Sequence, residues 1–234
     1  ADFLIPDYQR PYAWSEEECQ NLWEDIFTFA IPDDDATKFN SEEEYYLGPI
    51  VTFKNDSGKL EVIDGQQRLT TIMLLLRAFH VSFGNMQDEN SKRTREMIES
   101  CVWKTDEFGH ADKTKLKIDS EVATDKDKDE FLSILNSGVA TSEMKSKYAG
   151  NYRFFQKKID EFLHGYPSFF SYFPARILNN CILLPIFKVY SFQLSQSSSA
   201  SPSSILNIGY LVVNFSCHNI ISFGLKNLFV FQNK

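Results

Sequence analysis

The sequence predicts an α/β domain over residues 1–84, followed by a mainly α-helical region over residues 85–186. The first prediction rests on a strand–turn–strand pattern at 46–63, where a glycine-containing turn joins two apolar runs, and on the apolar segment 69–83 that follows it. The second rests on amphipathic stripes with helical spacing, of which 142–163 is the clearest. We therefore expect a hairpin that leads into one long buried helix, with further helices after it.

The N-terminal 44 residues contain an extended segment, a helix and a loop. FLIPDYQRPYAW (3–14) is expected to be extended, because each of its prolines disfavours helix at the preceding residue. Ser15 and Glu18 form a capping-box pattern, which predicts that an amphipathic helix begins at residue 16 and runs over 16–30. The segment 33–44 is acidic and is expected to be a surface loop.

Helices are expected at several places beyond residue 85. Candidate helices cover 91–103, 127–135 and 142–163, with Thr141 as the expected cap of the last one. The segment ILNNCILLPIF (177–187) is consistent with either a buried strand or a helix end.

The chain changes character after residue 187. Residues 191–204 are rich in serine, and the remainder is apolar without helical or strand periodicity. All 32 acidic residues of the chain lie before residue 162. We interpret 187–234 as a tail from out-of-frame or read-through translation, with a small apolar cap subdomain as the alternative.

Composition restricts the classes of function that are open. The formal net charge of −8 argues against nucleic-acid binding by bulk charge, although a local basic groove remains open. The four cysteines form no CxxC pair, which is typical of reduced thiols in a cytoplasmic protein. No segment approaches the roughly 20 apolar residues of a membrane span.

Four polar side chains crowd the predicted junction between the second strand and the buried helix. The free N–H groups of a helix N-terminus suit a phosphate, and Gly65 would let a ligand approach the backbone. Arg68 can bind a phosphate through two N–H groups, and Asp64 can hold a divalent cation or orient a water molecule. Gln66 and Gln67 can bind a ribose, a base or a phosphate. In the alternative interpretation, Asp64 caps the helix and Arg68 makes a surface salt bridge.

A second candidate motif is IPDYQRPYAW (5–14). Gln9 and Arg10 lie among aromatic residues and could contact a phosphate or stack on a base. The alternative is an edge strand with an aromatic staple, which fits Tyr12 and Trp14 better when they are considered alone.

Other motifs do not support a metal site or a familiar enzyme. DKDKDE (125–130) lacks the glycine and the glutamate of a calcium loop, so we interpret it as a solvated loop or a helix start. The four histidines form no pair at metal-ligand spacing, and GxxxxGK[ST], GxSxG and GxGxxG are all missing from the sequence.

Five motifs follow one another along the chain, namely IPDYQRPYAW (5–14), YLGPIV (46–51), VIDGQQRLTT (62–71), NYRFF (151–155) and CILLPI (181–186). In this order they resemble one family, the N-terminal domain of GmrSD-type, modification-dependent (type IV) restriction proteins, which has a ParB/sulfiredoxin-like fold. The resemblance covers about residues 3–186, and its most specific element is the DGQQR string between a strand and a helix.

The resemblance implies a domain that binds and hydrolyses a nucleoside triphosphate with Mg²⁺ and gates or powers a partner or fused nuclease acting on DNA. It assigns Asp64 and Arg68 to catalysis, with Asp64 also holding the metal. The remaining residues of the nucleotide site would be Gln9, Arg10, Gly65, Gln66, Gln67 and Thr70.

Two alternatives to hydrolysis stay open, namely a non-enzymatic ParB-like DNA-binding module with nucleotide as a switch, and a DNA-nicking domain. The family's later segment with Phe, Asn and Arg-Gly has no counterpart after Phe187, and its nuclease-type domain is missing. We therefore expect this chain alone to be catalytically incomplete. A homo-oligomer is also left open.

Overall fold

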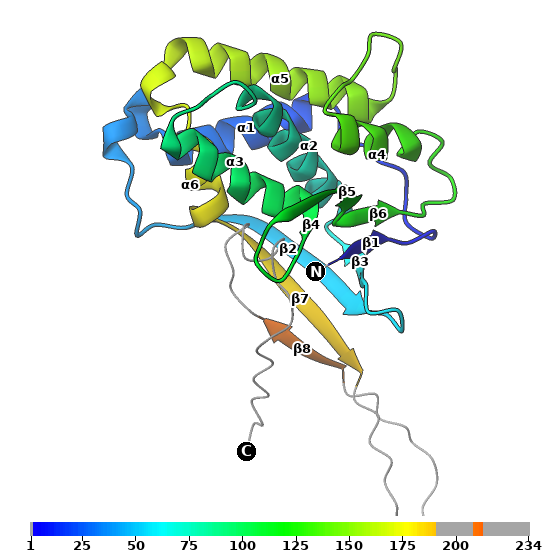
Figure 1. The fold of residues 1–234 in the computed structure, drawn as a ribbon. Helices are drawn as coiled ribbons and strands as arrows, with labels where there is room; N and C mark the ends of the chain where they lie inside the picture. Colours follow the sequence, from blue (N-terminus) through cyan, green and yellow to red (C-terminus); the bar gives the residue numbers. More distant parts are fainter. Residues whose placement is uncertain (1, 191–207, 213–234) are drawn as a thin grey trace, which may run out of the picture.

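The computed structural model describes residues 2–190 and 208–212, which form a mixed α/β domain (Figure 1). The elements in chain order are β1 (Phe3–Ile5), α1 (Glu16–Ala30), β2 (Tyr45–Lys54), β3 (Leu60–Asp64), α2 (Gln66–Ser82), α3 (Glu89–Val102), β4 (Trp103–Thr105), β5 (Ala111–Leu116), β6 (Ile118–Ser120), α4 (Lys128–Ser137), α5 (Lys147–Gly165), α6 (Tyr172–Asn180), β7 (Cys181–Tyr190) and β8 (Ile208–Val212).

The main sheet is mixed, with the strand order β6-β1-β3-β2-β7-β8. Strand β1 runs parallel to both β3 and β6, whereas β2 pairs with β3 as an antiparallel hairpin and with β7 in parallel. Figure 1 shows the helices gathered to one side of this sheet. The sheet therefore joins the N-terminal hairpin to strands that lie far away in the sequence.

Helix α2 is the centre of the core. Every residue from Leu69 to Phe79 is buried, because the helix packs against α3, α4 and α5. A helix that is apolar on nearly all sides can lie only in such an interior position. Aromatic rings fill the space around it, and the Phe173 ring contacts Trp23, Phe79 and Phe162. The predicted buried helix is confirmed.

Other predicted elements are confirmed, some of them with corrected bounds. The hairpin forms as expected, and helix α1 begins after Ser15 with the predicted capping box. Helix α5 begins after Ser146, whose side chain accepts a hydrogen bond from Ala149 N, so Thr141 is not its cap. The segment 177–187 contains both a helix end and a strand, because α6 stops at Asn180 and β7 starts at the next residue.

The prediction for residues 85–186 missed three short strands. Strands β4 and β5 form a two-stranded ribbon, and β6 adds to the main sheet beside β1. The ribbon sequence is mostly polar, so it lacks the apolar alternation by which a half-buried strand is detected. It is held by main-chain pairing and by Trp103, the first residue of β4, whose side chain is buried.

The two segments predicted on either side of residue 84 contribute to one sheet and one core. Strand β6 pairs with β1 and β7 pairs with β2, and the core cluster draws on residues from both segments. Most of the tail predicted to be non-native, 191–207 and 213–234, lies outside the described residues. Within the described part of the chain, no helix combines the length and the apolar character needed to cross a membrane.

Candidate functional site

The junction between β3 and α2 turns sharply at Gly65. The strand ends at Asp64, Gly65 has a φ of 87°, and the helix begins at Gln66. A Cβ atom on Gly65 would lie 2.7 Å from the main-chain oxygen of Pro49 in β2. Glycine is therefore required twice here, once for the left-handed conformation and once for the close approach of the neighbouring strand.

Gln67 holds the extended segment before α1 against the first turn of α2. Its Oε1 accepts hydrogen bonds from Ala13 N at 2.7 Å and Trp14 N at 3.4 Å, and its Nε2 donates to Pro11 O at 3.1 Å. The side chain is buried. A glutamine matches this task because a single amide both donates and accepts.

Gln66 and Gln9 complete the attachment of the same segment. Gln66 Nε2 donates to Arg10 O at 3.0 Å. Gln9 Nε2 donates to Val62 O at 3.1 Å and to Ile63 O at 2.8 Å, near the end of β3. The amide nitrogens of these three glutamines therefore hold main chain in place. The ligand contacts expected for these residues can come only from amide atoms that make none of these hydrogen bonds.

These contacts enclose a cleft of about 480 Å³, which we call the junction cleft. This volume is within the usual range for small-molecule sites. Seven of the eight predicted site residues line the cleft, and Trp14 and Pro49 join them. The predicted residues that line it are Gln9, Arg10, Asp64, Gly65, Gln66, Gln67 and Arg68.

Thr70 lies apart from this group. It is buried in the second turn of α2 and is not among the residues that line the cleft. Pro49 was missed because nothing in its local sequence marks it, and Trp14 was missed because it fitted an aromatic staple better than a ligand site. The interpretation of Tyr12 and Trp14 as an aromatic staple fits Tyr12, which is buried, stacks on Tyr148 at 4.6 Å between ring centroids, and hydrogen-bonds Thr71.

The cleft places positive charge beside an unengaged carboxylate. Arg68 Nη1 donates to Pro49 O at 3.1 Å, and the other guanidinium N–H groups make no hydrogen bond to a described residue. Arg10 is exposed, and so is Asp64, whose carboxylate makes no hydrogen bond or ion pair with another residue in the described part of the chain. The alternative in which Arg68 forms a surface salt bridge is not seen among these residues.

The start of α2 adds to this positive character. No side chain caps the helix, and its first turn contains no acidic residue. The unpaired N–H groups and the dipole of a helix N-terminus attract anions. The interpretation of Asp64 as a helix cap is wrong. Gly65 is the N-cap residue, and no side chain makes a capping hydrogen bond to the first turn of the helix.

The cleft suits a metal ion only if a ligand supplies most of the coordination. Within residues 2–190 and 208–212, no group of three or more His, Cys, Asp or Glu side chains could hold a metal. Mg²⁺ is commonly bound by one or two carboxylates together with phosphate oxygens and water. Asp64 fits that pattern, because both of its oxygens are available at the edge of a cleft that would take the phosphates.

The acidic string at 125–130 is structural. Asp125 is buried, and it accepts hydrogen bonds from Tyr148 Oη at 2.5 Å and Asp127 N at 3.0 Å. Helix α4 begins immediately after Asp127. The expected helix start is therefore confirmed, but Asp125 is not solvated.

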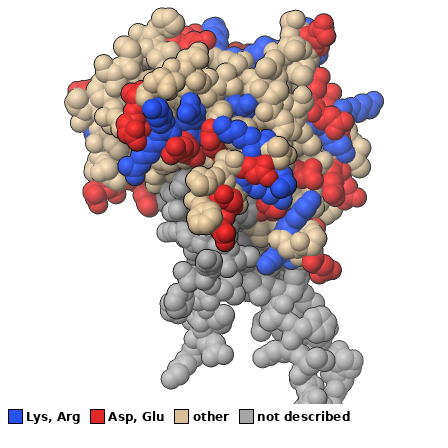
Figure 2. All heavy atoms as spheres, viewed as in Figure 1, with Lys and Arg blue, Asp and Glu red and all other residues tan. Residues whose placement is uncertain are grey.

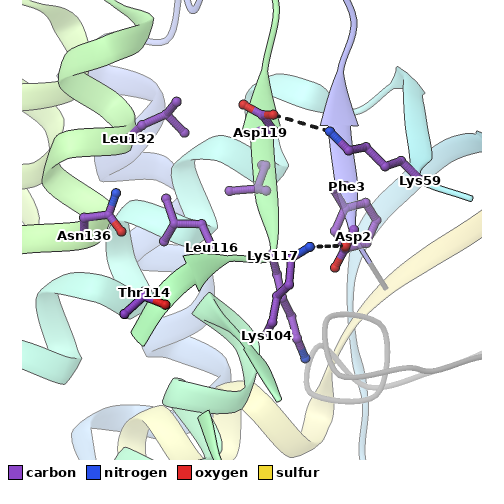
Figure 3. A pocket seen from close by; sticks show the side chains of 11 residues that line it. Asp2, Phe3, Lys59, Lys104, Thr114, Leu116, Lys117, Asp119, Leu132 and Asn136 are labelled. Carbon is purple, nitrogen blue, oxygen red and sulfur yellow. Dashed lines mark hydrogen bonds and ion pairs between the residues drawn. The ribbon is translucent and has the colours of Figure 1, made fainter. Parts of the chain in front are cut away.

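A smaller cleft of about 230 Å³ lies at the β1–β6 edge of the sheet (Figure 3). Lys59 pairs with Asp119 at 3.4 Å, and Lys104 pairs with Asp2. Lys117 is buried, and its Nζ donates to a main-chain oxygen at 2.6 Å. Since all three lysines already have partners, this cleft is less suited to an anion than the junction cleft.

The fold and site define a mixed α/β domain with a polar cleft at a strand–helix junction. The family model described as "GmrSD restriction endonuclease, N-terminal domain" matches residues 1–208, and the chain belongs to this family. The match extends past residue 186, where the sequence resemblance was expected to end. Family membership implies a role in DNA defence. No curated protein matches the chain.

Proposed function

We propose that the junction cleft binds a nucleoside triphosphate with Mg²⁺ and hydrolyses it, and that this reaction gates a nuclease acting on DNA. The observation that carries the proposal is the combination of an uncapped helix N-terminus, two arginines and a free carboxylate around one cleft. A ParB/sulfiredoxin-like arrangement is part of the proposal, supported by the β2–β3 hairpin that leads directly into α2.

Each residue would have a distinct task. The main-chain N–H groups at the start of α2 and the guanidinium of Arg68 would bind phosphate oxygens and offset the charge that develops on them. Asp64 would hold Mg²⁺ or orient the attacking water. The Gln67 and Gln66 amides would keep Arg10 and Trp14 at the cleft by holding their main chain.

DNA contact through bulk charge is less well supported. On the face that Figure 2 shows, lysine and arginine side chains are interspersed with aspartate and glutamate side chains. The chain is also acidic overall. A DNA-binding module generally relies on clustered basic residues that neutralise phosphates. We therefore favour nucleotide chemistry in this domain and assign DNA cleavage to a partner or fused nuclease.

The test is calorimetric titration of the full chain with ATP, GTP and CTP in the presence of Mg²⁺, together with measurement of phosphate release. Wild-type protein should bind at least one of them, and Asp64→Ala should release phosphate only at the background rate. The matched control is Asp56→Ala, which removes an exposed carboxylate from the β2–β3 turn. If no triphosphate binds, the proposal of a nucleotide site is refuted. If Asp64→Ala hydrolyses the nucleotide at the wild-type rate, the proposed role of Asp64 is refuted.

A further inference from the structure

A second cleft, of about 270 Å³, adjoins the junction cleft and lies between α1 and the start of β2. We call it the α1–β2 cleft. Trp14 and Arg68 line both clefts and form their common boundary. A molecule held by its phosphates at Arg68 could therefore continue past this boundary without leaving the protein surface.

The α1–β2 cleft has the opposite charge to its neighbour. Glu18, Asn21 and Asp25 line it from α1, where their spacing of three and four residues places them on one face of the helix. Glu18 accepts hydrogen bonds from the Ser15 hydroxyl and main-chain N–H, which lower the pKa of its carboxyl and keep it ionised. Carboxylates repel phosphate but accept hydrogen bonds from hydroxyl and amino groups.

The cleft also offers flat apolar surface. Tyr46 has an exposed fraction of 54%, and Trp14 is half-buried at the boundary. Tyr45 lies beside Asp25, and burial together with this carboxylate raises the pKa of its hydroxyl, so it remains a neutral phenol. Exposed aromatic rings are surfaces on which a nucleobase can stack.

We propose that the α1–β2 cleft binds the nucleoside end of the triphosphate. The phosphates lie in the junction cleft, the ribose hydroxyls donate to Asp25 and Glu18, and the base stacks on Tyr46 or Trp14. This inference rests on the proposed function, and it adds the direction in which the nucleotide lies and a preference for ribose over deoxyribose.

The experiment compares three classes of ligand on the full chain with Mg²⁺ by calorimetry. They are the four ribonucleoside triphosphates, their 2′-deoxy forms, and inorganic tripolyphosphate. At least one ribonucleotide should bind about tenfold tighter than tripolyphosphate, since base stacking and hydroxyl contacts add to phosphate binding. Its deoxy form should bind more weakly.

Two variants test whether the tighter binding of ribonucleotides comes from the α1–β2 cleft. Asp25→Asn and Tyr46→Ala should each weaken ribonucleotide binding several-fold and leave tripolyphosphate binding unchanged. Their matched controls are Asp160→Asn on α5 and Tyr172→Ala on α6, which alter exposed side chains of the same kinds elsewhere.

The outcomes separate the two proposals. If ribonucleotides and tripolyphosphate bind equally well, or if the two variants weaken both ligands alike, the nucleoside cleft is refuted while phosphate binding stands. If neither ligand binds the wild-type chain, the proposed function fails and this inference fails with it.

Discussion

Gln67 Oε1 accepts a hydrogen bond from Ala13 N at 2.7 Å, and this bond joins the first turn of α2 to a segment 54 residues earlier in the chain. The same side chain also bonds Pro11 O and Trp14 N. Because Trp14 lines both clefts, the position of their common wall depends on this buried amide and on Asn151, whose Nδ2 donates to Trp14 O at 3.0 Å.

Gln67→Ala should lower the free energy of unfolding by about 1–3 kcal/mol, since it removes a buried amide and leaves partly buried main-chain groups without partners. It should also weaken any ligand binding in the junction cleft. Gln87→Ala is the control, because Gln87 is exposed and should change stability by less than about 0.5 kcal/mol. Chemical denaturation measures both effects, and equal stabilities would contradict the anchoring role.

Gly65→Ala tests the close approach of β2 to the junction. Gly109 offers a matched control, because it has the same φ of 87° but nothing within 4 Å of an added Cβ. Both substitutions put an alanine into the left-handed conformation, which destabilises the fold by about 1–2 kcal/mol. Gly65→Ala should cost clearly more, because its Cβ would lie 2.7 Å from Pro49 O. If chemical denaturation shows similar losses of unfolding free energy for the two variants, β2 moves away from the added Cβ at no energetic cost.

Arg68→Ala should weaken tripolyphosphate binding about tenfold or more, since a charge-assisted hydrogen bond contributes roughly 1.5–3 kcal/mol. Arg93→Ala is the control, because it removes the same charge from an exposed position on α3. Calorimetry at two salt concentrations separates a direct Arg68–phosphate contact from the attraction of distant surface charges. Salt screens the distant charges strongly and the direct contact much less. Equal losses for the two variants would remove Arg68 from the site.

A largely buried cluster of Arg77, His80 and Glu99 predicts a dependence of stability on pH. Arg77 Nη1 donates to His80 Nδ1 at 2.8 Å, so the proton of neutral His80 is on Nε2, which donates to Glu99 at 2.8 Å. Burial lowers the pKa of His80, and the His80 and Lys113 bonds lower the pKa of Glu99 to about 2 although its burial opposes this. The unfolded chain therefore binds more protons at His80 below its ordinary pKa of about 6.5.

Stability should consequently fall as the pH is lowered through 6.5 towards the folded-state pKa of His80, and fall again below pH 4.5 as Glu99 becomes protonated in the unfolded chain. Thermal melts between pH 8 and 5 measure the first step. His80→Gln should flatten that step, whereas His164→Gln, at an exposed position on α5, should keep the wild-type profile. If His80→Gln loses as much stability as the wild type between pH 8 and 5, other titratable groups cause that loss.

The sequence predicted the hairpin, the buried helix and the polar junction between them, because strand alternation, a glycine turn and an apolar helix are local signals. It could not predict that β7 pairs in parallel with β2, since that contact joins segments more than 130 residues apart. The glutamines were ambiguous for a different reason. An amide can bind main chain or ligand equally well, and only the fold shows that Gln67 binds the main chain of 11–14.

The pairing of β2 with β7 also affects the order of events during synthesis on the ribosome. Pro49, which forms part of the wall of the junction cleft, lies opposite Leu184 in the sheet, and Gly48 lies opposite Leu183. A nascent chain that has released the DGQQR segment but not yet β7 has an unpaired β2 edge beside its helix. The edge of β2 that carries Pro49 is therefore paired only when translation has passed residue 184, long after the DGQQR motif has emerged.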